Sequence, residues 1–133
     1  MPPSGDRPGD IVIVGGYGHV GTELARRLAP LYPDRVVLAG RSREKAEQRA
    51  REIGCGSRGM SLDSAEGVAP DGAGTVIMCL DQFDPSFASD CLARGMGYVD
   101  ISADGRILEM IEALEPAALR GGDIACVLAE PVM

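Results

Sequence analysis

The chain has 133 residues, and its composition, 45% hydrophobic and 25% charged, is that of one globular domain with a single sizeable core. The chain is too short for a cofactor domain joined to a separate substrate domain. Its net charge is −7 and its isoelectric point is about 4.6, which argues against a nucleic-acid backbone or an anionic membrane as the main partner.

The first nine residues are predicted to lie outside the folded domain. Residues 1–9 lack the apolar h-region of a signal peptide, and we expect them to form a short disordered tail before a domain at 10–133. No apolar run elsewhere approaches the ~18 residues of a membrane span. We therefore expect a cytoplasmic protein.

An apolar strand at residues 11–15 runs into a glycine-rich turn and then into a helical pattern at about 18–29, followed by Pro30 and Pro33. The turn fits G-x-G-x-x-G, in which glycines allow a tight turn, backbone access to a pyrophosphate and close packing of helix on strand. The unpaired N–H groups and the dipole of the helix attract the anion without any lysine. The residues predicted to bind a dinucleotide here are Gly16, Tyr17, Gly18, His19, Val20 and Gly21.

Two side chains of the turn, those of Tyr17 and His19, have predicted roles of their own. Tyr17 and His19 can lean on the cofactor while their N–H groups face phosphate. For His19, a packing or hydrogen-bonding role is favoured over that of a general acid.

A continuous apolar run at residues 35–39 predicts a second parallel strand, buried on both faces. Ser42 is expected to cap a helix over residues 43–53, which stops at Gly54. Glu47 and Arg51 stand at i,i+4 in that helix, whose charges should face solvent.

Strand and helix patterns then alternate to the end of the chain. We expect strands at 57–62, 75–80, 98–101 and 123–129, a loop at 64–74, and helices at 84–95 and 104–114. This alternation predicts a Rossmann-type α/β fold, a doubly wound parallel sheet of about six strands in the order 3-2-1-4-5-6 with helices on both faces.

The residues after the second strand predict the choice of cofactor. An Asp or Glu about 20 residues beyond the glycine turn usually binds the ribose 2′-hydroxyl of NAD. Here Arg41 and Ser42 take that place, and Arg41 can pair with a 2′-phosphate while Ser42 donates a hydroxyl or backbone N–H. NADP(H) is therefore predicted over NAD(H), and Arg43 is expected to be solvated.

Other candidate cofactor contacts follow the later strands, because ligands lie at the carboxyl ends of such sheets. Asp63 could border the adenine, and Leu80 and Asp81 the nicotinamide ribose. Asp100 lies near the same edge, where a helix cap or a loop anchor is the favoured role for an aspartate.

Cysteines at 55, 79, 91 and 126 are scattered without a C-x-x-C pair, and we expect buried free thiols. With one histidine and no metal-like cluster, no metal site is predicted.

The turn also fits G-x-x-G-x-x-G from Gly15, the spacing of short-chain dehydrogenases. Their chemistry needs a Tyr-x-x-x-Lys pair. The only lysine is Lys45, and the residue four positions before it is Arg41 instead of a tyrosine, so this pair cannot form.

Three segments carry a family resemblance that spans residues 10–130. With Gly-Gly-Tyr-Gly-His-Val-Gly21, Gly-Arg-Ser42 and Tyr-Val-Asp-Ile-Ser102, the chain resembles the N-terminal NAD(P)-binding domain of the saccharopine dehydrogenase-like family. The resemblance implies an oxidoreductase that transfers hydride at a C–N bond, with a substrate and dimerisation domain in the longer members. It leaves the catalytic residues unassigned.

The chain departs from this family in two places. It stops at Met133, where members continue into a second domain, and Leu80-Asp-Gln-Phe83 lacks the Gly-Pro or Pro-Pro of many members. We therefore expect a cofactor-binding fragment that is inactive alone, whose substrate contacts and possible homodimer interface lie in a missing domain. The alternative is a non-catalytic NADP(H)-sensing module.

Overall fold

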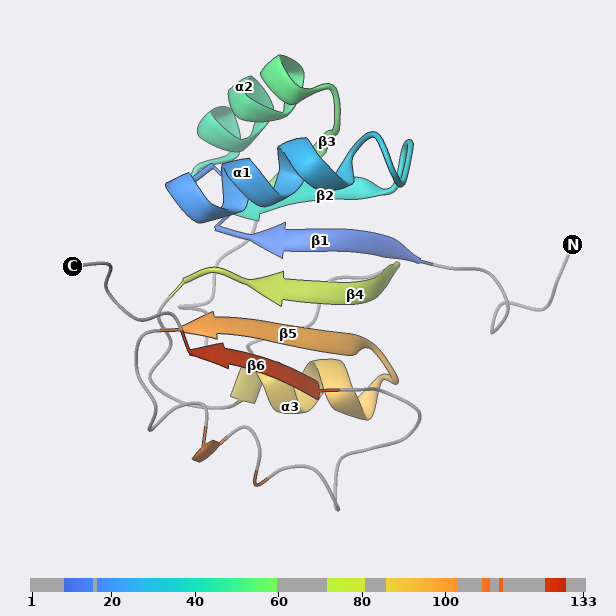
Figure 1. Ribbon diagram of the computed structural model, residues 1–133, viewed down its shortest axis with the longest axis vertical. Helices are drawn as coiled ribbons and strands as arrows, with labels where there is room; N and C mark the ends of the chain where they lie inside the picture. The colour runs from blue at the N-terminus through green and yellow to red at the C-terminus, as the bar shows by residue number, and fades with distance from the viewer. Residues whose placement is uncertain are drawn as a thin grey trace, which may run out of the picture.

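The computed structural model describes residues 9–15, 17–59, 72–80, 86–102, 109–110, 113 and 124–128. Six parallel strands form one sheet in the order β3-β2-β1-β4-β5-β6, which confirms the predicted Rossmann-type topology (Figure 1). The strands are Asp10–Val14 (β1), Val36–Gly40 (β2), Gly56–Gly59 (β3), Ala73–Met78 (β4), Gly97–Ser102 (β5) and Ile124–Leu128 (β6).

Helices pack on both faces of this sheet. They are α1 (His19–Leu28), α2 (Arg43–Ile53) and α3 (Ser86–Ala93) in the described part of the chain. Ile11 and Ile13 of β1 belong to a core cluster with residues of α1 and α2, whereas Val12 and Val14 belong to a cluster with α3. Because successive side chains of a strand point to opposite faces, α1 and α2 cover one face and α3 the other.

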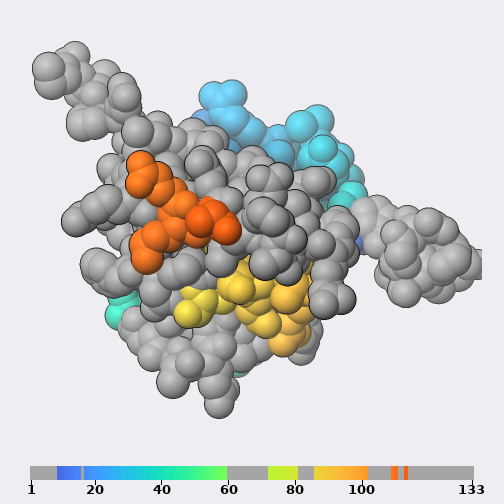
Figure 2. Space-filling model, turned by 90° about the horizontal axis from the view of Figure 1, so that it is seen from below, coloured from blue at the N-terminus to red at the C-terminus, as the bar shows by residue number. Residues whose placement is uncertain are grey.

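The two central strands are mostly apolar on both faces. In β1, every residue after Asp10 is buried, and in β4 Val76, Ile77 and Met78 are buried as well. This is the pattern of a parallel strand covered on both faces. α3 turns one face to that core, and its outer side lies at the surface, in yellow in Figure 2.

The ends of α2 are those that the sequence predicts. The Ser42 hydroxyl accepts a hydrogen bond from the backbone N–H of Lys45 at 3.2 Å, and Gly54 ends the helix with φ of +90°. One expected pair is different: Glu47 accepts from Arg43 at 3.2 Å, one turn earlier in the helix, rather than from Arg51.

Some predicted boundaries are wrong. β4 begins at Ala73, inside the loop expected at 64–74, because β1 pairs with it from Asp10 onward. It ends at Met78 rather than at residue 80. β2 and α1 are each displaced or shortened by one residue at their ends relative to 35–39 and 18–29.

Several expectations lie outside the described residues. These are the tail at residues 1–8, most of the helix expected at 104–114, the residues 60–62, and Asp84 with Pro85. Within the described residues, no helix is long and apolar enough to cross a membrane.

Candidate functional site at the carboxyl ends of β1 and β4

The turn after β1 is closed by backbone hydrogen bonds. Gly15 has φ of +84°, a left-handed conformation that a side chain would strain. A Cβ atom at Gly15 would also stand 2.9 Å from Cγ of Leu80. The N–H of Gly18 donates to the carbonyl of Gly15 at 3.0 Å, which turns the chain into α1.

The start of α1 offers donors to an anion. Gly18 is the N-cap without a side-chain cap, and the first turn of the helix contains no acidic residue. N–H groups in a first helical turn have no partner within the helix, and they stand at the positive end of its dipole. Gly21 is buried where α1 meets the sheet, and His19 and Val20 are exposed. Gly16 lies outside the described residues.

After the carboxyl ends of β1 and β4, the chain continues to opposite faces of the sheet. β1 leads into α1, and β4 leads toward α3 on the other side of the sheet. This is the topological switch point, where open α/β sheets bind their ligands. Leu80, 36% exposed, follows β4 and lies against Gly15. Asp63 and Asp81 lie outside the described residues.

The Tyr17 side chain crosses from the turn to the end of β2. Its ring lies over Gly40, where an added Cβ would collide with the ring Cε1 atom. Its hydroxyl accepts a hydrogen bond from the backbone N–H of Ser42 at 3.3 Å. The turn, the end of β2 and the start of α2 are thus tied together by one aromatic side chain. The pattern of the sequence did not indicate this contact.

The residues predicted to choose the cofactor lie beside this contact. Arg41 is exposed, between the end of β2 and the start of α2. Ser42 is partly buried, and the cap to Lys45 engages its hydroxyl oxygen as an acceptor. Its hydroxyl proton can still be donated. The side chain of Arg43 is 77% exposed, which agrees with its expected solvation.

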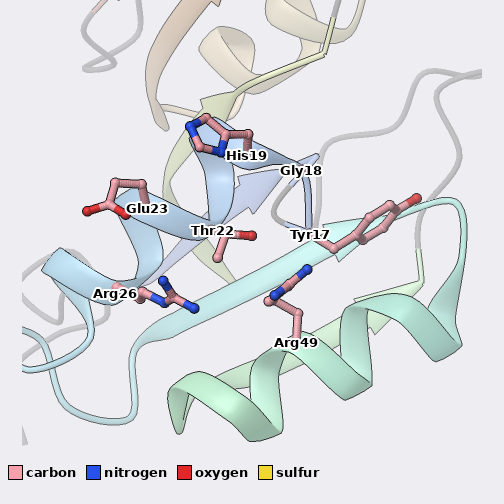
Figure 3. Close-up of a pocket in the computed structure, with 7 residues that line it drawn as sticks. All are labelled: Tyr17, Gly18, His19, Thr22, Glu23, Arg26 and Arg49. Carbon is pink, nitrogen blue, oxygen red and sulfur yellow. The ribbon is translucent and has the colours of Figure 1, made fainter.

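A cavity of about 350 Å³ lies beside the turn, between α1 and α2 (Figure 3). Arg26 of α1 and Arg49 of α2 line it, with Thr22 between them in the view, and His19 lies at its upper edge. His19 is a predicted site residue, whereas Thr22, Arg26 and Arg49 are not predicted from the sequence. Their signal is helical spacing, since His19, Thr22 and Arg26 share one face of α1.

A second cavity, of about 240 Å³, adjoins the first along α2. Tyr17 and Arg49 line both cavities. Among the described residues, those that line the cavities belong to the turn, α1 and α2, and none belongs to a strand. The candidate ligand site is therefore defined by the switch point between β1 and β4 and by the turn after β1. Both cavities border the side chain of Tyr17.

Strand β5 contains a buried polar pair. The Tyr98 hydroxyl donates to Oδ2 of Asp100 at 2.7 Å, and both residues are 1% exposed. Asp100 is therefore a core residue, and the expectation of a helix cap or a loop anchor is wrong. Burial, together with the charge of Asp100, raises the pKa of the nearby Cys79 thiol to about 11.

Three of the four cysteines have described side chains. Cys91 is buried, while Cys55 and Cys79 are partly buried, and all three are free. No group of three or more potential metal ligands occurs among the described residues.

Comparison with known proteins gives a fold and no family. No family model matches the chain. A stretch of 74 residues is 42% identical to the spectinabilin polyketide synthase system protein NorB of Streptomyces orinoci, a match that takes in 50% of this chain. The chain spans only 3% of the length of that protein.

Solved structures resemble most of the chain. A proposed short-chain oxidoreductase from Thermus thermophilus has a TM-score of 0.65 over 92% of this chain and 80% of its own. Saccharopine dehydrogenase from Saccharomyces cerevisiae has a TM-score of 0.65 over 89% of this chain and 26% of its own. GenD2 from gentamicin A biosynthesis, in complex with NAD, has a TM-score of 0.60, over 96% and 37% respectively.

Each of these three structures is 18% identical to the chain. The likeness shows a shared Rossmann-type fold.

Proposed function

We propose that the chain binds a nicotinamide dinucleotide at the carboxyl ends of β1 and β4. The observation that carries this proposal is the turn between β1 and α1, in which Gly15 is left-handed and Gly18 opens a helix without acidic residues in its first turn. Such a turn at a switch point is where a pyrophosphate is held. The NAD complex of GenD2, a structure of similar fold, supports this choice of ligand.

We further propose that the cofactor is NADP(H) rather than NAD(H). Arg41 follows β2, the place where NAD-binding chains usually carry an acidic residue. Its guanidinium is always charged and can hold a 2′-phosphate through two hydrogen bonds. The same proposal assigns Asp63 to the adenine, and Leu80 and Asp81 to the nicotinamide ribose.

The proposed reaction is hydride transfer at a C–N bond, in an oxidoreductase of the saccharopine dehydrogenase-like family. The bound cofactor would supply the hydride chemistry, and the residues of this chain would bind and orient it. The similar fold of saccharopine dehydrogenase supports the assignment, as do the sequence segments around Gly21, Ser42 and Ser102.

Titration calorimetry with NADP(H) and NAD(H) tests the cofactor proposal. We expect NADP(H) to bind more tightly, and Arg41→Ala to remove most of the difference. Hydrogen bonds to a charged group contribute about 1.5–3 kcal/mol, or about 10- to 150-fold in affinity.

Arg43→Ala is the matched control, since this exposed arginine pairs with Glu47. It should leave the preference for NADP(H) unchanged. Equal affinity of the wild-type chain for both cofactors would contradict the assignment of Arg41.

We also propose that substrate groups come from a second domain, in a cytoplasmic enzyme that can form homodimers. The chain spans 26% of saccharopine dehydrogenase, so that most of a protein of that size would lie outside it. On this proposal, the 133-residue chain binds NADPH without oxidising it in the presence of an aldehyde and an amino acid. Rapid loss of NADPH absorbance with the chain alone would contradict it.

A further inference from the structure

We propose that Tyr17 covers the adenosine-ribose position of the cofactor site in the free protein, and that a dinucleotide has to displace it. This inference rests on the proposed function. It assigns Tyr17 a role opposite to that of a simple cofactor ligand, because the side chain competes with the cofactor for the same backbone donor.

The first step is the place of the ring. Gly40 is the last residue of β2, and the ring of Tyr17 lies so close to its Cα that no side chain could stand there. In dinucleotide-binding sheets, the adenosine ribose sits at the end of this strand. The phenol ring therefore occupies the surface that the ribose would use.

The second step is the shared donor. The backbone N–H of Ser42 points to the Tyr17 hydroxyl at 3.3 Å. Ser42 is the N-cap of α2, and N–H groups at helix starts are natural donors to phosphate. One N–H cannot donate fully to the phenol oxygen and to a 2′-phosphate at once. Binding of NADP(H) therefore breaks the contact between Tyr17 and Ser42.

The third step is the strength of the contact. A distance of 3.3 Å is long for an N–H···O hydrogen bond, whose usual range ends near 3.2 Å. The covering is therefore weak and reversible. If only the uncovered fraction binds, the apparent affinity falls in proportion to that fraction, which for one neutral hydrogen bond means about two- to tenfold.

The fourth step is where the ring goes. Tyr17 borders the cavity of about 350 Å³ between α1 and α2 and the cavity of about 240 Å³ along α2, so there is space beside the ring into which it can rotate. Arg49 lines both cavities and can stack on the displaced ring. In Figure 3 the ring extends away from Arg49, toward the start of α2.

The test compares NADP(H) binding by the wild-type chain and by Tyr17→Phe. This variant keeps the ring and removes the hydroxyl that holds the Ser42 N–H. We expect Tyr17→Phe to bind NADP(H) about two- to tenfold more tightly. Tyr32→Phe, a change at a tyrosine 39% exposed beyond α1, is the control and should leave affinity unchanged. Weaker or unchanged binding by Tyr17→Phe would overturn the proposal.

A second measurement needs no cofactor. In the free protein, the amide proton resonance of Ser42 should shift in Tyr17→Phe, while that of Gly54, at the other end of α2, stays in place. An unchanged Ser42 resonance would also overturn the covering. If neither protein binds a dinucleotide although the Ser42 resonance shifts, the proposed function fails and the contact stands.

The movement itself can be followed by fluorescence. The chain has three tyrosines and no tryptophan, so tyrosine emission is not masked. We expect NADP(H) to change the emission of the wild-type chain, and most of this change to persist in Tyr32→Phe. If Tyr32→Phe abolishes it, the signal does not come from Tyr17, and displacement of the ring is excluded.

Discussion

Inside the core, the hydroxyl of Tyr98 donates a hydrogen bond to the carboxylate of Asp100, two residues further along β5. Tyr98 also makes an edge-to-face contact with Phe87 of α3, with ring centroids 6.4 Å apart. This geometry holds the ring, and the ring carries the hydroxyl to Asp100 at 2.7 Å. Oδ2 of this carboxylate, at a position 1% exposed, accepts this short hydrogen bond, which offsets part of the cost of burying the group.

Tyr98→Phe is predicted to lower the free energy of unfolding by about 1–3 kcal/mol, since the buried acceptor loses a donor while the ring packing stays. Urea denaturation followed by circular dichroism measures this. Tyr32→Phe serves as the control, and it should lie within about 0.5 kcal/mol of the wild type. A neutral Tyr98→Phe would show that the hydrogen bond contributes little.

Single residues of the candidate site differ in how far the sequence could predict them. Gly18, Arg41 and Ser42 follow from local spacing, because the turn and the cap are formed by neighbours in the chain. The contact of Tyr17 with Gly40 joins residues far apart in the sequence, and it depends on how α2 starts. Asp100 was misassigned because an aspartate near a strand end resembles a helix cap until its burial is known.

At the scale of one helix, the end of α2 gives a clean prediction. Gly54 has φ of +90°, and an added Cβ there would meet nothing within 4 Å. Gly54→Ala should therefore cost only the backbone strain, about 1–2 kcal/mol. Gly54→Asn should cost less, since asparagine tolerates this conformation. Thermal denaturation of both variants checks the order, and an alanine variant as stable as the wild type would contradict it.

α3 gives a prediction about alkaline pH. Burial is the main cause that raises the pKa of Cys91 from about 9 to about 12, and the charge of Asp90 adds to it. The unfolded chain therefore loses this proton first. Stability is complete below about pH 9 and falls as the pH rises toward 12, by up to about 1.4 kcal/mol per pH unit from this thiol.

Cys91→Ala should flatten that decline between pH 9 and 11, as measured by urea denaturation at each pH. The matched variant is Cys55→Ala, at a thiol whose pKa burial also raises and which is less buried. It should flatten the curve less. A curve for Cys91→Ala as steep as that of the wild type would show that other groups cause the decline.

Strands and helices could be predicted as elements, but their ends could not. The order of the sheet followed from alternation of the patterns, and the apolar runs of β1 and β4 are unmistakable because both faces are covered. The start of β4 at Ala73 was missed, since strand pairing with β1 extends it into a glycine-rich loop.

For the molecule as a whole, the order of the strands determines which backbone amides exchange their hydrogens most slowly. β1 and β4 each have a neighbour on both sides, whereas β3 is an edge of four residues. Hydrogen exchange should be slowest at the amides of Val12–Val14 and Val76–Met78, where exchange requires global unfolding. The amides of Gly56–Gly59 should exchange faster, and equal protection of both groups would contradict this.

The ladder between β1 and β4 has one more consequence. β1, β2 and β3 come from residues up to Gly59, and β4, β5 and β6 from residues after Gly72. The sheet therefore consists of two sequential halves that pair along one seam, between β1 and β4. Each half keeps its own strand neighbours and its own helices. A chain cut between these two glycines should reassemble from separately made fragments, and polar substitution of Val12 or Val76 at the seam should prevent it.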